Sequence, residues 1–346
     1  MSLLLVLILF TTPQHHSFEL ERSENFRLGD AYNVQVAADG SILMAEGPKL
    51  FHWDLEGNLI RVIEPVPNKA DIRGIITFAY AANEEMYWVV DFYENQVFFF
   101  DRSGNLLGSD WSVPPDAEDP ESVLYRRLIP CGSRIFAMDV ASLTRRYPGL
   151  PKVFQLLEVK IPKEGARIER VGPLSYPIRQ QLKNYNYKFK QHWIVQREFS
   201  KHFFVVDELS TTMQEYGPEK GKNVEDGLIR LVREIPLMME DRVPPKPPNF
   251  EEIFSSREQH LKWISSFSRV KGLYPLGKDL LIGYSLPDET VFGRLVLQRI
   301  DMKGNRKGHK VLTDGILLGS HDGSAFVLEK PPEGSSGRYI VHAYKL

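Results

Sequence analysis

The sequence predicts an all-β fold built from repeated four-stranded units, and three observations support this prediction. Residues 86–107 contain two runs of β-branched and aromatic residues separated by polar turns, as in a β-hairpin. A similar segment lies upstream, at residues 41–60. The acidic strand ends of the two segments, Glu46 and Asp91, lie roughly 45 residues apart, which is the period of a four-stranded propeller blade. Together these observations predict a β-propeller.

The composition is that of an ordinary globular protein. The formal net charge of the 346-residue chain is −2, so no overall electrostatic field favours nucleic acid or an anionic membrane. Cys131 is the single cysteine, and it cannot form a disulfide within the chain. The stability of the fold is therefore expected to come from packing.

The N-terminal residues 2–10 form an apolar run. It is too short to cross a bilayer, which takes about 20 residues, but it fits the apolar region of a signal peptide. No Lys or Arg precedes it and no Ala-x-Ala site follows it, so a buried N-terminal strand is the alternative. We predict a leader over residues 1–16, a single propeller domain over 17–346 without a transmembrane span, and export to the periplasm or the extracellular space.

Hairpin signals divide the rest of the chain into strand-rich units. Asp39-Gly40, between two apolar runs, is the strongest of these signals. The predicted blades cover residues 33–64, 75–111, 124–172, 187–235, 267–314 and 316–346.

The two ends of the chain are expected to share one blade. The last unit has only three strands, whereas the segment 18–22 is an isolated strand before the first unit. Pairing the two ends closes the ring and removes the free sheet edges of an open array. The prediction is a six-bladed propeller of four-stranded blades, with 18–22 completing the last blade. An open all-β array and a seven-bladed ring with one blade missed are the alternatives.

One helix is expected as an insertion. Residues 242–248 are rich in proline and read as an extended spacer. Asn249 is a candidate N-cap, and Glu252 stands at the capping-box position. An apolar stripe at helical spacing follows, which predicts a helix over residues 250–264.

Residues 90–97 and 100–106 resemble an NHL-type repeat, which reads Val-x-Asp, a short polar turn with Asn, and then Phe-Asp-x-x-Gly-x-Leu. Gln96 stands where that family usually has Arg. The chain as a whole resembles the bacterial six-bladed β-propeller proteins related to NHL-repeat and TolB-like propellers. These families contain both binding proteins and enzymes, so the resemblance implies the fold and leaves the activity open.

The connections between the predicted strands indicate which face of the propeller binds a ligand or partner. Strand direction alternates within a blade, so the second-to-third turns and the connections between blades share one face, called here the loop-rich face. Long connections lie on it at 112–123, 141–152, 172–187 and 236–266, whereas the turns of the opposite face are mostly tight, with the loop 217–227 as an exception. Long loops on a rigid scaffold are the usual place for binding. We therefore predict a non-catalytic propeller that binds a protein, a small molecule or a carbohydrate on this face.

The second strands end mostly in carboxylates on the same face. The candidate metal ligands are Glu46, Asp91, Asp139, Asp207 and Glu329, and Tyr284 takes this position in the fifth unit. A ring of carboxylates would suit Ca²⁺, and a metal there would polarise a lactone or ester carbonyl, as in the gluconolactonase-type propellers that this arrangement resembles. The alternative function is thus a Ca²⁺-dependent, lactonase- or esterase-like hydrolase or lyase. The competing structural interpretation is that these residues cap turns through backbone amides.

A basic and aromatic segment supplies the second candidate site. Its residues are Arg179, Lys183, Tyr185, Tyr187, Lys188, Lys190 and Trp193. Such a segment suits stacking on sugar rings or contact with an acidic partner. In an exported protein we expect a sugar or an acidic partner rather than nucleic acid. The structural alternative is that the segment forms a strand with one face exposed to solvent and the other buried in the core.

Other catalytic signatures are missing from the sequence. It contains no Gly-x-Ser-x-Gly elbow, phosphate-binding loop or dinucleotide fingerprint, and its histidines show no metal-ligand spacing. No catalytic residue is assigned. A third hypothesis is an assembly scaffold in an envelope complex, which would use an apolar patch on the rim or on the helix 250–264.

Overall fold

The computed structural model describes part of the chain. The described residues are 15–20, 34–37, 39–64, 72–81, 85–91, 96–111, 125–131, 134–139, 153–160, 169–177, 192–196, 202–218, 229–239, 241–244, 255–287, 294–329 and 339–346.

The described strands pair into six four-stranded antiparallel sheets. Two sheets come from β2 (Val34–Val36), β3 (Ile42–Glu46), β4 (Lys49–Trp53), β5 (Leu59–Ile63), and from β6 (Ile75–Ala81), β7 (Met86–Asp91), β8 (Gln96–Asp101), β9 (Leu106–Trp111). Two more come from β10 (Tyr125–Cys131), β11 (Arg134–Asp139), β12 (Val153–Lys160), β13 (Glu169–Pro177), and from β14 (His192–Gln196), β15 (Phe203–Asp207), β16 (Thr212–Pro218), β17 (Ile229–Pro236). The next contains β18 (Arg269–Leu276), β19 (Asp279–Ser285), β20 (Leu295–Ile300) and β21 (Arg306–Thr313).

The remaining sheet joins the two ends of the chain. Its strands are β22 (Ile316–His321), β23 (Ser324–Leu328), β24 (Ile340–Lys345) and β1 (His15–Glu19). β1 is the outer strand and pairs with β24, from His15 opposite Tyr344 to Glu19 opposite Ile340. The N-terminal strand thus completes the last sheet, but it begins earlier than the predicted segment 18–22. His15 and His16 therefore lie in the sheet, although the leader was expected to extend to residue 16; an edge strand tolerates polar residues that face solvent.

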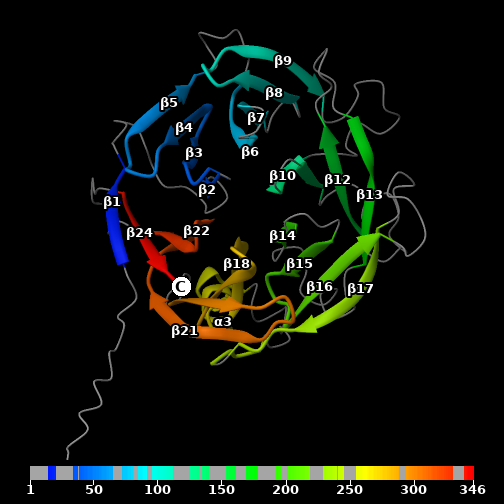
Figure 1. The fold of residues 1–346 in the computed structure, drawn as a ribbon, viewed down its shortest axis with the longest axis vertical. Helices are drawn as coiled ribbons and strands as arrows, with labels where there is room; N and C mark the ends of the chain where they lie inside the picture. The colour runs from blue at the N-terminus through cyan, green and yellow to red at the C-terminus, as the bar shows by residue number, and fades with distance from the viewer. Residues whose placement is uncertain are drawn as a thin grey trace, which may run out of the picture.

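The sheets stand in a ring around a central axis (Figure 1), with β6, β10, β14 and β18 among the strands nearest to it. Contacts between innermost strands link β6 to β10, β14 to β18, β18 to β22, and β22 to β2. The prediction of an all-β propeller is confirmed. No helix among the described residues is long and apolar enough to cross a membrane.

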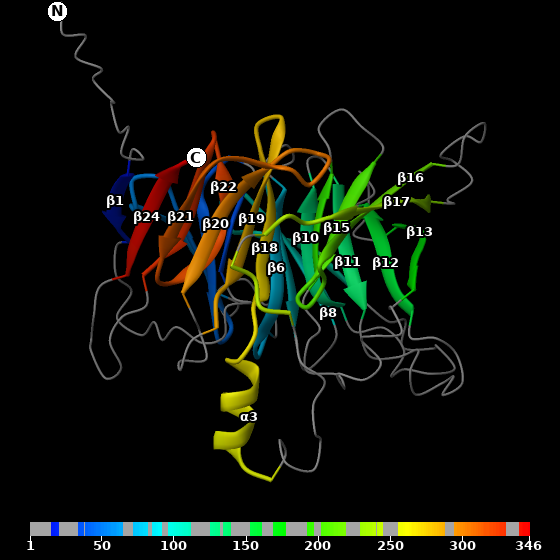
Figure 2. The same ribbon diagram turned by 90° about the horizontal axis from the view of Figure 1, so that it is seen from below.

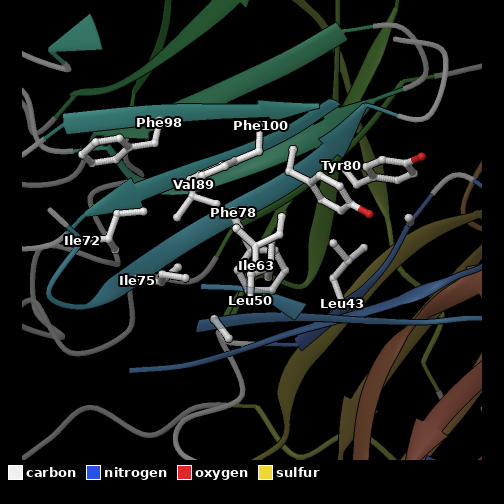
Figure 3. Packing of buried hydrophobic residues seen from close by; sticks show 13 residues of the cluster. Leu43, Leu50, Ile63, Ile72, Ile75, Phe78, Tyr80, Val89, Phe98 and Phe100 are labelled. Carbon is white, nitrogen blue, oxygen red and sulfur yellow. The ribbon is translucent and has the colours of Figure 1, made fainter. Parts of the chain in front are cut away.

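The hydrophobic core lies between neighbouring sheets. Figure 3 shows the cluster in which Leu43 and Leu50 of one sheet pack against Phe78, Phe98 and Phe100 of the next. Side chains on both faces of a sheet are thereby buried, which explains why runs such as Val97–Phe100 are apolar without alternation.

Three of the sheets share the same turn between their third and fourth strands. An aspartate accepts hydrogen bonds from the backbone and side-chain amides of the asparagine four residues later, over 2.8–3.0 Å, in the pairs Asp54–Asn58, Asp101–Asn105 and Asp301–Asn305. Desolvation raises the pKa of each carboxyl, but these hydrogen bonds outweigh it and the net pKa is lowered.

The glycine of this turn touches the outer strand of the neighbouring sheet. A Cβ on Gly57 would lie 2.1 Å from the carbonyl oxygen of Glu19, and one on Gly304 would lie 2.3 Å from that of Pro236. At Gly104 the nearest atom, Cδ of Arg61, is 3.6 Å away. The turn therefore connects successive sheets, and at Gly57 the strand it contacts is β1.

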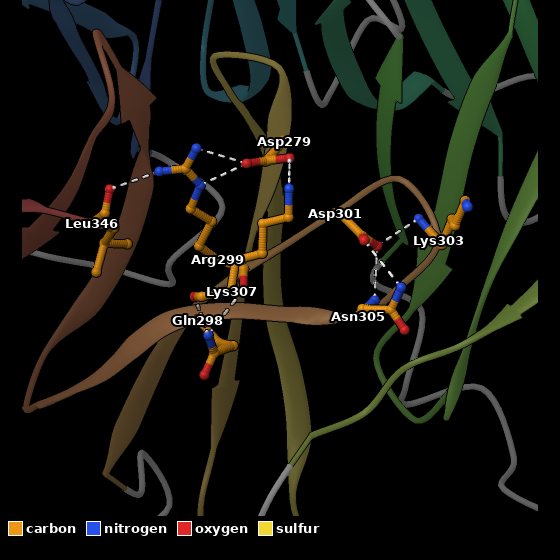
Figure 4. A network of polar contacts seen from close by, with 8 residues as sticks. All are labelled: Asp279, Gln298, Arg299, Asp301, Lys303, Asn305, Lys307 and Leu346. Carbon is orange, nitrogen blue, oxygen red and sulfur yellow. Dashed lines mark hydrogen bonds and ion pairs between the residues drawn. The ribbon is translucent and has the colours of Figure 1, made fainter.

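A charge network also joins two sheets. The buried carboxylate of Asp279, at the start of β19, accepts two hydrogen bonds of 2.7 Å from Arg299 and pairs with Lys307 at 3.3 Å (Figure 4). Arg299 also donates to the carbonyl of Leu346, over 3.3 Å, and so links the β18–β21 sheet to the end of the chain.

Among the described residues one segment is α-helical, α3 (Arg257–Ile264). Ser256 is its N-cap, in an extended conformation, and its hydroxyl accepts a 3.1 Å hydrogen bond from the amide of Gln259. The helix therefore begins at Arg257, later than the predicted residue 250, because its N-cap Ser256 has an extended backbone conformation. The predicted cap Asn249 and its partner Glu252 lie outside the described residues.

Candidate functional site

α3 stands out from one face of the ring and leads directly into β18 (Figure 2). The segment 241–244 is held beside the start of β18, since the amide of Ser268 donates to the carbonyl of Val243 over 2.9 Å and the amide of Val243 donates to the Ser268 hydroxyl over 3.0 Å. These elements belong to the predicted loop-rich face. The connections 112–123 and 141–152 lie outside the described residues, as does most of 172–187.

A cluster of charged residues gathers on this face where β15 ends and β18 begins. It consists of Asp207, Glu208, Arg242, Arg269 and Lys271, and it is called here the β18 polar cluster. The Asp207 carboxylate accepts a 3.0 Å hydrogen bond from the amide of Leu209, which forms the turn after β15. The carbonyl of Glu208 accepts a 2.8 Å hydrogen bond from the amide of Val270, which fastens this turn to β18.

One carboxylate in the cluster faces two cations. The side chain of Glu208 is 6% exposed, and its Oε1 lies 3.3 Å from Nη1 of Arg269 and 3.6 Å from Nζ of Lys271. Burial lowers the pKa of Lys271 to about 8; the charge of Glu208 opposes this shift and the charge of Arg269 adds to it. The Glu208 carboxylate is thus shared between the two cations.

Lys271 owes its place to a β-bulge. Val270 lies opposite Tyr284, whereas Gly272 lies opposite Gly283, so Lys271 is an extra residue in β18. A bulge re-aims a side chain away from the regular alternation of the strand. The side chain of Lys271 remains 25% exposed, although Arg269 beside it is only 8% exposed.

Arg242 is the third cation of the cluster. Its Nη2 donates a 2.8 Å hydrogen bond to the carbonyl of Leu209, and its buried Nη1 has no hydrogen-bond partner among the described residues. Burial lowers the pKa of Arg242 to about 10, while the nearby Asp207 and Tyr284 oppose this shift. Tyr284 lies one residue before the end of β19, at the position where the sequence lacks a second-strand carboxylate, and it is close enough to influence the guanidinium.

Two of the predicted metal ligands hold the backbone. Asp91 is fully buried, and its Oδ1 accepts hydrogen bonds from the amides of Arg73 at 3.0 Å and Gly74 at 2.9 Å. Asp207 caps the turn after β15, as described above. Both contacts agree with the structural interpretation of the acidic strand ends.

The other predicted ligands are spread over separate sheets. Glu46 ends β3, and Glu329 directs its Oε2 to within 3.1 Å of Nε2 of His342 on β24. Asp139 ends β11, but its side chain lies outside the described part of the structure. Within that part, no group of three or more His, Cys, Asp or Glu could hold a metal ion. The carboxylate ring therefore stays a sequence-based prediction.

Trp193 is not available for ligand stacking. It is 3% exposed in β14 and belongs to the hydrophobic cluster that contains Phe204 and Val206. This burial agrees with the structural alternative for Trp193, because neighbouring sheets cover both faces of the strand. The other candidates in the basic and aromatic segment, Arg179, Lys183, Tyr185, Tyr187, Lys188 and Lys190, lie outside the described residues.

Sequence reasoning missed most of the β18 polar cluster. Glu208, Arg269 and Lys271 are distant in sequence or hidden in a strand that reads as ordinary. The available signals were a second acidic residue directly after Asp207 and two cations flanking Val270.

No family model matches the chain, and no curated protein matches it. Several solved structures match the chain. A member of the DUF4221 family from Bacteroides vulgatus ATCC 8482 is 10% identical, with 96% of each chain covered and a TM-score of 0.61. A putative exported protein from Bacteroides fragilis NCTC 9343 is 10% identical, with 96% of this chain and 95% of that chain covered and a TM-score of 0.51.

The WD40 repeats of RRP9 are 8% identical, with 97% of this chain and 100% of that chain covered and a TM-score of 0.51. This chain has a β-propeller fold. At such low identity the likeness shows the fold alone, so the function must be argued from the residues of this chain.

Proposed function

We propose that the protein is a non-catalytic propeller that binds a ligand or a partner protein through its loop-rich face. The observation that carries this proposal is the β18 polar cluster, in which Arg242, Arg269 and Lys271 outnumber the carboxylates of Asp207 and Glu208. Burial lowers the pKa of both Lys271 and Arg242, and ionisable groups with perturbed pKa values are concentrated at functional sites.

We propose further that the six sheets are the blades of one closed ring, related to NHL-repeat and TolB-like propellers. Support comes from the shared Asp-x-x-Gly-Asn turn, its contact with the neighbouring outer strand, and the pairing of β1 with β24. The domain was expected over residues 17–346, and the pairing of His15 and His16 with β24 would extend it to residue 15. Export rests on the apolar run 2–10 and on the likeness to a putative exported protein.

The test compares the two faces of the ring. The full chain is screened by thermal unfolding against oligosaccharides, acidic peptides and small organic acids, since a ligand of the native state raises the midpoint by mass action. Lys262→Glu, on the exposed side of α3, changes the loop-rich face, and Lys278→Glu changes the opposite face.

We expect a ligand whose stabilisation is reduced by Lys262→Glu and unchanged by Lys278→Glu. Sensitivity to Lys278→Glu alone would place binding on the opposite face and contradict the proposal. Turnover of a lactone or ester substrate by the purified chain would contradict the non-catalytic role.

A further inference from the structure

We propose that His15 and His342 bind a divalent transition-metal ion, Cu²⁺ or Ni²⁺, at the seam where the two ends of the chain pair. The site lies on the two outer strands of the last sheet, β1 and β24. It is independent of the proposed function, which rests on the β18 polar cluster.

The two imidazoles face each other with one nitrogen each. Nε2 of His15 lies 2.9 Å from Nδ1 of His342, and the ring centroids are 5.1 Å apart. His342 lies opposite Ser17, two residues from His15, so the two histidines are diagonal neighbours on one side of the sheet. Tyr344, directly opposite His15, stacks on its ring with the centroids 5.0 Å apart. The sheet thus holds both rings where one ion can reach both nitrogens.

The Glu329 carboxylate determines which nitrogen of His342 carries the proton. Its Oε2 lies 3.1 Å from Nε2 of His342. An ionised carboxylate only accepts hydrogen bonds, so this Nε2 is protonated and, in the neutral ring, Nδ1 carries the lone pair that faces His15. Metal-bound histidines typically donate their other ring N–H to a carboxylate in the same way, which fixes the ring and raises its basicity. Glu329 is thus a positioning residue for a metal ligand, His342.

The separation of the two nitrogens favours particular ions. Two nitrogens about 2.0–2.1 Å from one metal lie about 2.9 Å apart in adjacent positions of a square-planar ion and about 3.3 Å apart around a tetrahedral ion. The separation of 2.9 Å fits the square-planar arrangement, which is typical of Cu²⁺ and Ni²⁺. The ion would replace the proton between the rings, and that proton would move to Nδ1 of His15. Ca²⁺ and Mg²⁺ prefer oxygen ligands and are not expected to bind.

The site is open to solvent. His15 is exposed and the side chain of His342 is 19% exposed, so an ion in solution can reach both rings. Water would fill the other coordination positions, because no group of three or more metal-ligating residues gathers in the described part of the chain. The two ligands are 327 residues apart in the sequence, so the unfolded chain does not hold them together. A bound ion would therefore stabilise the pairing of β1 with β24.

The experiment uses the full chain, purified without a polyhistidine tag, with Cu²⁺ and Ni²⁺ as probes and Ca²⁺ as the negative control. Calorimetric titration measures binding, and the nitrogen hyperfine splitting in the EPR spectrum of bound Cu²⁺ reports its ligands. We expect a single stoichiometric site with two imidazoles. His15→Gln and His342→Gln should each remove it. Glu329→Gln should weaken binding about tenfold and keep the two-imidazole spectrum.

The matched control is His16→Gln, since the side chain of His16 points to the opposite side of β1 and its loss should leave metal binding unchanged. Urea unfolding without metal should be similar in all of these variants, because the replaced side chains are largely exposed or lie at the edge of the sheet. Loss of binding can then be separated from loss of structure.

Amide exchange tests whether the ion joins the two ends of the chain. At a metal concentration about ten times the dissociation constant, exchange in β1 should slow about tenfold, because opening of this strand requires release of the ion. The effect should vanish in His342→Gln. Unchanged binding in His15→Gln or His342→Gln, an equal loss in His16→Gln, or unchanged exchange in β1 with metal bound would each overturn the inference. Weak binding spread over several histidines would show adventitious ions only and would overturn it too.

Discussion

The turn glycines allow a direct test of how the ring is held together. Gly57 has a φ of +88° and Gly104 one of +82°, so an alanine at either position costs about 1–2 kcal/mol from the left-handed conformation alone. At Gly57 the new Cβ would also meet the Glu19 carbonyl at 2.1 Å, whereas at Gly104 it would meet only Cδ of Arg61 at 3.6 Å. Overpacking against an atom that cannot move freely adds about 1–3 kcal/mol. The structure therefore predicts a larger loss for Gly57→Ala.

The measurement is urea unfolding of the two variants beside the wild type, followed by tryptophan fluorescence. The free energy of unfolding should fall about 1–3 kcal/mol further in Gly57→Ala than in Gly104→Ala. Amide exchange should also rise in β1, because the clash pushes that strand away from the turn. Gly47→Ala, with a φ of +55° and no atom within 4 Å, reports the conformational cost by itself. Equal losses at Gly57 and Gly104 would refute the contact between the turn and β1.

Four further outcomes are expected. Deleting residues 1–20 removes β1 and exposes the edge of β24, so size-exclusion chromatography should show self-association and unfolding should begin at lower temperature. The free energy of unfolding of Asp101→Asn should lie below that of the wild type by a constant amount above about pH 5, and this difference should shrink as the pH falls below about 4. The reason is that a carboxyl with a lowered pKa contributes stability only while it is ionised. Urea midpoints measured from pH 2 to 6 check this. Asp279→Asn should cost about 1–3 kcal/mol in urea unfolding, since Arg299 and Lys307 lose their shared carboxylate, and Lys278→Asn is the control. Millimolar Ca²⁺ should not raise the midpoint of thermal unfolding above the midpoint in EDTA. A rise that is lost in the double variant Asp91→Ala, Asp139→Ala would instead support the metal-dependent hydrolase.

Local patterns in the sequence account for most of the strands. Runs of β-branched and aromatic residues, with Asp-Gly and Asp-x-x-Gly-Asn turns between them, are short-range signals that need no knowledge of the rest of the chain. The isolated N-terminal strand was also expected to complete the last sheet, because an unpaired edge is unfavourable. Its exact start at His15 was missed, since an outer strand can carry polar residues that disguise it.

The roles of individual side chains depend on what packs against them. Trp193 resembles a stacking residue in sequence, yet neighbouring sheets bury it in the core. Asp91 resembles a metal ligand, yet its Oδ1 accepts the amides of Arg73 and Gly74. In both cases the partners come from other segments of the chain, and a local pattern cannot contain that information.

The sequence by itself determined that this is an all-β repeat protein with one face richer in long connections, because strand, turn and spacing signals are local. Only the tertiary structure decided where charge gathers on that face. Glu208, Arg242 and Lys271 come from three separate segments, and a bulge and backbone hydrogen bonds between those segments bring them together. Their shared burial, which lowers the pKa of Lys271 and Arg242, exists only once the sheets have packed into a ring.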